Sequence, residues 1–383
     1  MTDELVKGFR DFTGEEAEKL SEIKKIIVKN FEKYGFESAE TPVIEYEDFV
    51  KGGDKNEDKD EVISDIFKLK DKGKRNLALR YEFTFQLKRL MKGKKLPYKR
   101  FEIGNVFRDE PASTNRLRQF TQCDADIVGL SDIQGRDEAE ILSLTSDILK
   151  ELGIKPLILI NNRKLLNEIL DDLKIGKNKE QVLREIDKFD KITEKELRTN
   201  LKKFKAEKLM DSLNQGEDYF NKFESYKEIV SLIDYCRIYG LEVKFSPTII
   251  RGLSYYNGNV FEVKAQGIKE TVVAGGSYKF NDVQCTGISF GLERLGTVAS
   301  LKSEKEEYLV VSLGEDKKAI KLAQKLRNEN KEVSIYYGKP TKALEYANSY
   351  KISKVIFIGE KETQSGKAKV KDMKSGKESE IKL

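Results

Sequence analysis

The chain has 383 residues and a mass of 44.0 kDa, enough for two or three domains that each bury a core. Charged residues make up 36% and hydrophobic residues 38%, and no apolar run approaches the length of a membrane span. A secretory signal has an apolar segment after its first basic residues, and the N-terminal stretch MTDELVKGFRDF has no such segment. These features predict a soluble, cytoplasmic protein with no membrane contact.

Two residue types limit the chemistry that this chain can perform. Cys123, Cys236 and Cys285 are odd in number and widely spaced, which favours buried free thiols over a disulfide framework. Histidine is absent, and with it the commonest general base and neutral metal ligand. This argues against zinc sites and against serine or cysteine triads. We therefore predict no metal-ligand set, and chemistry based on carboxylates, arginines, lysines, tyrosines and bound ions.

The net charge of +5 is unevenly distributed along the chain. Residues 306–383 contain 17 Lys+Arg against 12 Asp+Glu, whereas residues 1–305 contain 54 of each. A basic C-terminal segment indicates a polyanionic partner, and it fits an ordinary solvated surface equally well.

The first third of the chain predicts a helix followed by several strands. Apolar residues at helical spacing over 15–34, with Gly35 after them, indicate a long helix, and FESAETPVIEYEDF indicates an extended segment. This pair fits a dimer-interface element or an ordinary helix on a sheet. Strand-like runs follow at 76–85, 98–108 and 119–130. Antiparallel strands close in sequence predict an α+β sheet rather than βαβ winding.

The middle of the chain predicts a helix over 136–152, a strand over 156–161 and charged helical sequence from Arg163 to Tyr239, which we interpret as an insertion. In RGLSYYNGNVFEV, residues 251–263, Asn257-Gly258 lies between apolar and aromatic runs and predicts a tight hairpin. The hairpin fits an amphipathic sheet edge, or a site that holds a small polar ligand with hydroxyls and a cation. ETVVAGGSYKF then predicts a strand, and TGISFGLERLGTVASL a strand that runs into a helix.

A charged break, LKSEKEE at 301–307, precedes the tail. There the strand-like runs YLVVSL, EVSIYY and KVIFIGE alternate with helices over 317–328 and 342–350. This βαβαβ order predicts a small α/β domain with a parallel sheet.

Three arginines form the constellation that indicates chemistry. FRDE (107–110), a polar loop and RLRQF (116–120), paired as two strands, bring Arg108 and Arg116 to one site beside Phe120. Two guanidinium groups suit a polyphosphate, and an aromatic face suits a planar base. GLERL adds Arg294 at a strand-to-helix junction, after glycines such as Gly291 that permit close approach. Surface Arg–Glu pairing is the simpler explanation for any single pair, but the joint pattern is specific.

These residues resemble motifs 2 and 3 of the class II aminoacyl-tRNA synthetases, and the helix with the Pro42 strand resembles motif 1. RGLSYYNGNVFEV, LALRYEFT, RQFTQCDADIVG and AGGSY resemble the histidyl-tRNA synthetase family, with the archaeal-type variant the most similar. LRNENKEVSIYYG, KALEYANSYKI and VKDMKSGKE in the tail resemble its anticodon-binding domain. The resemblance covers nearly the whole chain and is weakest in the helical insertion.

The resemblance implies an α+β fold, with a class II antiparallel sheet, flanking helices, a helical insertion and a C-terminal α/β anticodon-binding domain. It implies a catalytic domain in two parts, 1–162 and 240–302, with the insertion at 163–239 and the anticodon-binding domain at 306–383. It also implies ATP with Mg²⁺, L-histidine and tRNA(His) as ligands, and a homodimer. The reaction would form histidyl-adenylate and then charge the tRNA, as in a histidine–tRNA ligase.

Site residues are carried over by matching motif positions. Arg108, Arg116 and Arg294 would hold the ATP phosphates near Gly291, with Glu110 on the adenine side and Phe120 stacked on adenine. Arg251 would lie on the α-phosphate as a catalytic residue together with Arg108. The amino acid would be held by two sets of side chains: Glu82, Thr84 and Gln122 at the α-amino group, and Asp126, Tyr255 and Tyr256 at the imidazole.

The sequence departs from the family pattern at a few positions. Ser254 replaces an aspartate, Ser277 and Lys279 replace an arginine and an aspartate, and Asp126 is shorter than the bacterial glutamate. Two alternatives also stay open. A catalytically inactive histidine-sensing paralogue, of the ATP phosphoribosyltransferase regulatory-subunit type, is opposed by the tail and the arginines. A class II synthetase for another amino acid is opposed by TQCDAD and the two tyrosines.

Overall fold

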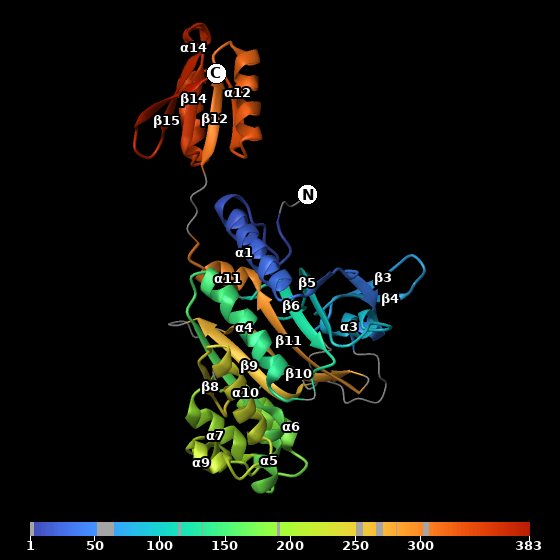
Figure 1. Ribbon diagram of the computed structural model, residues 1–383. Coiled ribbons are helices and arrows are strands. Elements are labelled where there is room, and N and C mark those ends of the chain that lie inside the picture. Colours follow the sequence, from blue (N-terminus) through green and yellow to red (C-terminus); the bar gives the residue numbers. More distant parts are fainter. Residues whose placement is uncertain are drawn as a thin grey trace. The chain divides into compact units, whose positions relative to one another are not determined.

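The computed structural model describes residues 4–51, 65–113, 116–131, 133–189, 192–249, 256–265, 271–280, 282–301 and 306–383. The chain divides into two compact units, Met1–Leu301 and Lys302–Leu383, which we describe separately (Figure 1). Within the described residues no helix is long and apolar enough to cross a membrane.

An eight-stranded sheet, in the order β1-β5-β6-β11-β10-β9-β7-β8, forms the centre of the first unit. Its pairs are antiparallel from β5 to β7 and parallel at the two ends, β1 with β5 and β7 with β8. This confirms the predicted α+β sheet. The strands are β1 (Glu37–Ala39), β5 (Tyr98–Phe107), β6 (Gln119–Val128), β7 (Pro156–Asn162), β8 (Val243–Phe245), β9 (Tyr256–Ala265), β10 (Thr271–Phe280) and β11 (Val283–Gly291).

Helices α1 (Gly14–Lys33), α4 (Arg136–Glu151) and α11 (Leu292–Val298) lie along one side of this sheet (Figure 1). Apolar side chains of α1, α4 and α11 pack there with Cys123, Ala125 and Ile127 of β6 in one hydrophobic core. Because side chains alternate along a strand, Gln122, Asp124 and Asp126 point to the other face of the sheet. The alternation of β6 thus separates the core from a polar face.

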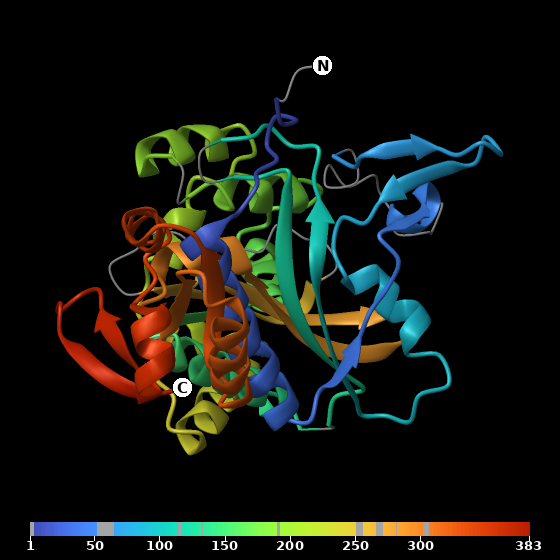
Figure 2. The same cartoon turned by 90° about the horizontal axis from the view of Figure 1, so that it is seen from above.

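A smaller sheet, β2-β4-β3, contains Ile44–Tyr46, Asn76–Leu79 and Lys68–Lys70, with the short helix α2 (Glu47–Val50) beside it (Figure 2). The strand predicted over 76–85 was wrong in its second half. Strand β4 ends at Leu79, and α3 (Thr84–Leu90) begins five residues later. Phe83, Leu87 and Leu90 recur at helical spacing, and the buried Phe83 and Leu87 favour the helix over a continued strand.

The segment 163–239 is helical, as predicted. Its buried apolar side chains belong to the same hydrophobic core as those of α1, α4 and the large sheet. The insertion is therefore packed into the first unit. Its helices are α5 (Arg163–Asp172), α6 (Lys179–Ile186), α7 (Glu194–Lys202), α8 (Leu209–Leu213), α9 (Glu217–Phe220) and α10 (Tyr226–Ile238).

The Asn257-Gly258 pair does not form the predicted hairpin turn. Both residues lie inside β9, which is continuous between β7 and β10, and neither has the positive φ that a type I′ turn requires. Tyr256 pairs with Tyr278 and Val260 with Gly276, so extra residues of β9 form a bulge opposite β10. The predicted arm before Tyr256 lies outside the described residues.

The second unit contains a five-stranded sheet in the order β13-β12-β14-β15-β16. The first three strands are parallel, as predicted, but β15 and β16 are antiparallel. This confirms the βαβαβ prediction for the three strands that it named, and β15 and β16 are two further strands that the sequence had not indicated. The elements are β12 (Glu307–Ser312), α12 (Asp316–Asn328), β13 (Glu332–Tyr337), α13 (Pro340–Ser349), β14 (Lys354–Ile358), α14 (Glu360–Ser365), β15 (Lys367–Asp372) and β16 (Glu378–Lys382).

Candidate active site

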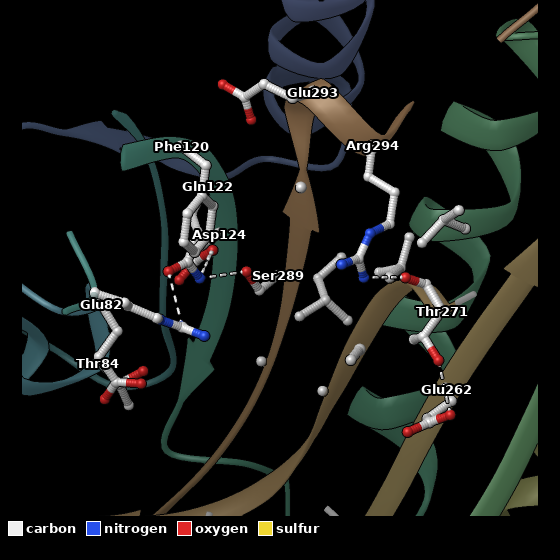
Figure 3. A pocket seen from close by; sticks show the side chains of 18 of the residues that line it. Glu82, Thr84, Phe120, Gln122, Asp124, Glu262, Thr271, Ser289, Glu293 and Arg294 are labelled. Carbon is white, nitrogen blue, oxygen red and sulfur yellow. Dashed lines mark hydrogen bonds between the residues drawn. The ribbon is translucent and has the colours of Figure 1, made fainter. Parts of the chain in front are cut away.

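A cavity of about 1150 Å³ lies on the polar face of β6. It is lined by every predicted site residue that the structure describes, and side chains from opposite walls converge on it (Figure 3). Arg251 and Tyr255 lie outside the described residues, so their positions stay predictions. The predicted residues that line the cavity are Glu82, Thr84, Arg108, Glu110, Arg116, Phe120, Gln122, Asp126, Tyr256, Gly291 and Arg294.

Arg108 follows the last residue of β5 and is held between two aromatic rings. Its guanidinium carbon lies 4.4 Å from the ring centroid of Tyr81 and 5.1 Å from that of Phe120. Its Nη2 donates to Gln122 Oε1 at 3.4 Å. Tyr81 was not predicted, and burial raises the pKa of its hydroxyl to about 12. Arg108 therefore presents a fixed cation beside an aromatic face, as a nucleotide requires.

Arg116 lies on the other side of the loop that joins β5 and β6. Its guanidinium forms an ion pair with Glu110, which also accepts a hydrogen bond from the Tyr81 hydroxyl at 3.2 Å. The surface Arg–Glu pairing considered from the sequence is thus present. Because the side chain of Arg116 is 58% exposed, a polyanion that enters the cavity can compete for it.

The GLER segment places its two charged residues in different roles. Glu293 accepts hydrogen bonds from the backbone N–H of Thr121 at 2.9 and 3.0 Å, and burial raises its pKa. Arg294 extends along the cavity and donates to the backbone oxygen of Thr271 at 2.7 Å, whose hydroxyl donates to Glu262 (Figure 3). Glu293 therefore fixes the start of β6, while Arg294 lines the wall opposite Glu82 and Thr84.

Asp126 lies on the floor of the cavity, with both oxygens engaged. Arg100 of β5, which is fully buried, places Nη2 3.0 Å from Asp126 Oδ2, and the Tyr278 hydroxyl donates to Oδ1 at 2.5 Å. Burial raises the pKa of Asp126, and these two partners oppose the rise. A Cβ at Gly287 would clash with Oδ1, so only glycine admits this carboxylate. Sequence reasoning missed Arg100 and Tyr278.

Asp124 was also missed, although it lies between two predicted residues on the same face of β6. It is 5% exposed, and Gln122 Nε2 donates to its Oδ1 at 3.3 Å and to Ser289 Oγ at 2.6 Å (Figure 3). Burial and the neighbouring Asp126 raise the pKa of Asp124 to about 8. The signal in the sequence was the alternation QCDAD, which places both aspartates on one face.

Of the departures from the family pattern, Ser277 and Lys279 lie away from the cavity lining, Asp126 lines it, and Ser254 lies outside the described residues. Ser277 donates to the buried Glu138 of α4 at 2.7 Å, and Lys279 pairs with Asp282 at 3.0 Å. Asp187 and Phe189 of the insertion reach the cavity, which no sequence pattern had indicated. Within the described residues, no group of three or more Cys, Asp or Glu is arranged to hold a metal ion, and the three cysteines are buried and free.

Comparisons with known proteins cover nearly the whole chain. A family profile described as histidyl-tRNA synthetase matches residues 8–295, and one described as an anticodon binding domain matches residues 305–383. Histidine–tRNA ligase 1 of a Bacillus cereus strain is 33% identical, over 99% of this chain and 97% of its own. Histidine–tRNA ligase of Wolinella succinogenes is 34% identical, over 98% and 95%.

Two solved structures share the fold. A histidyl-tRNA synthetase from Nostoc sp. PCC 7120 superposes with a TM-score of 0.83 at 23% identity, over 100% of this chain and 97% of that chain. An ATP phosphoribosyltransferase regulatory subunit/histidyl-tRNA synthetase from Bacillus halodurans C gives 0.77 at 22% identity, over 93% and 98%. The similarity to the archaeal-type variant stays a prediction.

The family profile matches residues 8–295, and curated relatives are about one-third identical over nearly their whole length. This chain therefore belongs to the histidyl-tRNA synthetase family.

Proposed function

We propose that this chain activates L-histidine with ATP to histidyl-adenylate and transfers the histidyl group to tRNA(His). Its family supports the aminoacylation of tRNA and the use of ATP. The finer proposal depends on one observation: a single cavity combines arginines beside an aromatic face with a floor of buried carboxyl groups. The first set suits a nucleotide, and the second suits a cationic, hydrogen-bonding amino acid.

ATP would bind on the side of the cavity where the arginines lie. Arg108, Arg116 and Arg294 would contact the phosphates, and Phe120 would stack on adenine with Glu110 nearby. The aromatic contacts of Arg108 and the exposure of Arg116 support these roles. Mg²⁺ would enter with ATP, held mostly by phosphate oxygens and water, since the described residues offer no three-carboxylate set.

Histidine would bind over the floor of the cavity. Glu82, Thr84 and Gln122 would hold the α-amino group, while Asp126 and Tyr256 would contact the imidazole together with Tyr255. Asp126 can still accept a ring N–H, because each carboxylate oxygen has a second lone pair beside those used by Arg100 and Tyr278.

Adenylate formation needs no general base in this site. The substrate carboxylate is already ionised; its oxygen forms a bond to the α-phosphorus while the bond to the pyrophosphate leaving group breaks. The protein contributes position and positive charge. We propose that Arg251 contacts the α-phosphate, where negative charge develops, together with Arg108.

The second unit and one surface of the first unit support the proposed partners. Residues 305–383 match the anticodon-binding profile, which supports contact with the anticodon of tRNA(His). Val43, Ile44, Tyr46 and Leu69, on or next to β2 and β3, are 38–57% exposed and support a homodimer. We also propose that the catalytic domain spans 1–162 and 240–302, the helical insertion 163–239 and the anticodon-binding domain 306–383.

A second candidate function comes from the structural likeness to the regulatory subunit/synthetase of Bacillus halodurans C. At 22% identity this likeness concerns the fold alone. A histidine-sensing protein without catalysis would still bind histidine over the cavity floor. The arginines that line the cavity and the anticodon-binding unit favour the synthetase.

An ATP–pyrophosphate exchange assay with each of the twenty amino acids separates these functions. We expect exchange with histidine alone, because a site that hydrogen-bonds its ligand rejects analogues by roughly 10⁴-fold or more. Comparable exchange with threonine, proline or glycine would refute the assignment. Histidine binding without any exchange would instead favour the sensor.

A further inference from the structure

The floor of the cavity holds more carboxyl groups than cations. Glu82, Asp124 and Asp126 line it, and Arg80, Arg100 and Glu102 are buried outside its lining; all six are at most 5% exposed. Ion pairs join the two arginines to only two of these carboxyl groups, Glu102 and Asp126. Arg100 contacts Asp126 at 3.0 Å and Glu102 at 3.8 Å, and Arg80 contacts Glu102 at 3.4 Å. Among the described residues Asp124 has no such cationic partner.

Several ionisable or charged groups surround Asp124. Burial, Asp126 and Glu82 disfavour its ionised form, whereas Ser289 and Arg100 favour it, and the balance raises its pKa to about 8. At neutral pH Asp124 therefore keeps its proton. The groups that face it from each packed element are Asp126 on β6, Arg100 and Glu102 on β5, Arg108 after β5 through Gln122, Glu82 before α3 and Tyr278 on β10 through Asp126.

A pair made of one carboxylate and one carboxylic acid matches a neutral imidazole. The ring has one N–H donor and one nitrogen acceptor, while Asp126 accepts and a protonated Asp124 donates. Residues two apart on a strand are separated by roughly 6.6–6.8 Å. Both side chains point to the same face of β6 and line the cavity, so a five-membered ring that lies between them can contact one carboxyl group at each nitrogen.

We propose that Asp124 and Asp126 together read the two ring nitrogens of histidine, with one proton shared between Asp124 and the nitrogen that faces it. The inference rests on the proposed function, since it takes histidine as the amino acid in the cavity. It assigns Asp124 a role in specificity, next to the predicted role of Asp126. An amino acid without a ring acceptor would leave the Asp124 proton without a partner in a buried site.

The shared proton gives histidine binding a defined pH dependence. Below about pH 6.5 the free ring also carries a proton, so one proton must leave when the complex forms. Above about pH 8 the free Asp124 is ionised and the free ring is neutral, so one proton must be taken up. Affinity for histidine is therefore highest between these values and falls on both sides.

Proton uptake on histidine binding tests the inference with the full chain and without ATP. Calorimetric titrations at pH 8.5, in two buffers of different ionisation enthalpy, give the number of protons bound per histidine. We expect the wild type to take up at least half a proton more than Asp124→Asn, whose amide can donate but cannot titrate. The difference between the two proteins removes the contribution of the substrate α-amino group.

Asp172→Asn serves as the matched control, because Asp172 is an exposed carboxylate of α5 paired with Lys222 outside the cavity. It should bind as many protons as the wild type. Ser289→Ala is a second variant, independent of whether Asp124→Asn folds. Loss of the Ser289 hydrogen bond should move the alkaline fall in affinity to higher pH.

Each outcome separates the inference from the proposed function. Equal proton uptake by the wild type and Asp124→Asn, or an unmoved alkaline fall in Ser289→Ala, would overturn the shared proton and leave histidine activation intact. Failure of the wild type to bind histidine or to support exchange would overturn the proposed function itself. An analogue with a weakly basic triazole ring should lose the acidic fall in affinity and keep the alkaline one.

Discussion

The buried cluster at the cavity of the first unit and the surface of the second unit place charged groups in opposite environments. Asp124 and Asp126 on the floor of the cavity, and Arg100 in contact with Asp126, are at most 5% exposed, and burial raises the pKa of both carboxyl groups. In the second unit Glu306, Glu378 and Glu380 lie at the surface, where hydrogen bonds from lysines lower their pKa. Hydrogen bonds from Lys354 and Lys331 lower the pKa of Glu306 to about 2.

This difference in burial indicates separate roles for the buried charges at the cavity and the surface charges of the second unit. Burying a charged group costs several kcal/mol of desolvation free energy. Ion pairs and hydrogen bonds offset only part of this cost when some of the partners are absent. Surface ion pairs cost little and contribute little. An excess of buried carboxyl groups therefore suits a site that a ligand completes. The surface charges of the second unit keep it solvated and net basic, which favours contact with a polyanion.

The largest predicted effect follows from removing one member of the buried cluster. Arg100→Met leaves Asp126 and Glu102 buried without their shared cation, and we expect a loss of about 3–5 kcal/mol in unfolding free energy. Lys367→Met, which breaks the exposed pair with Glu380, should cause no resolvable change. Urea unfolding of both variants measures the contrast. Similar small losses in both would mean that burial does not distinguish the two sets of charges.

The next effect concerns function in the two units. A chain that ends at Leu301 retains the cavity and its core, so pyrophosphate exchange should stay within a few-fold of the full chain. Charging of tRNA should fall at least tenfold, because the basic unit is missing. Affinity of the full chain for tRNA should decrease with salt, as release of counterions requires. Equal charging by both chains would contradict a role in tRNA binding.

Stability should also depend on pH, with opposite signs in the two units. The pKa of Asp124 is about 8 in the folded state and about 3.9 when unfolded, so its contribution to stability is complete below pH 4 and is lost as pH rises to 8. Asp124→Asn should therefore melt clearly above the wild type at pH 9, where the wild type carries an ionised buried carboxylate and the variant does not. The advantage should disappear near pH 4.

Glu306→Gln provides the opposite sign in the second unit. Because the pKa of Glu306 is lowered to about 2, its contribution is present above the unfolded value and is lost as pH falls toward 2. This variant should be slightly less stable than the wild type at neutral pH and equal to it in acid. Melting curves that show the same sign for both variants would contradict the proposed contrast.

The sequence predicted those parts of the fold that depend on neighbouring residues. The hairpin of β5 and β6 followed from two alternating runs joined by a polar loop, and α1 and α4 followed from helical spacing. Arg108, Phe120 and Gln122 therefore lie where the sequence placed them, around one cavity. The period of two along β6 was enough to point these side chains to one face.

The errors arise where distant strands decide the local structure. Asn257-Gly258 became a bulge because β10 offers hydrogen-bond partners beside β9, which the dipeptide does not reveal. The antiparallel β15 and β16 had no counterpart in the predicted βαβαβ pattern. Arg100 was missed because its partner Asp126 comes from the next strand, and a charged residue inside a strand does not indicate its own burial.

The missing side chain at Gly287 affects the entropy cost of substrate binding. The carboxylate of Asp126 packs directly against the backbone of β11, and its contacts with Arg100 and Tyr278 restrict its remaining movement. The rotamer of Asp126 is thus fixed when the protein folds. The side chain has already lost its conformational entropy before a ligand binds. A ligand that meets this carboxylate finds it already oriented, so binding requires no search among side-chain conformations and no ordering of the acceptor.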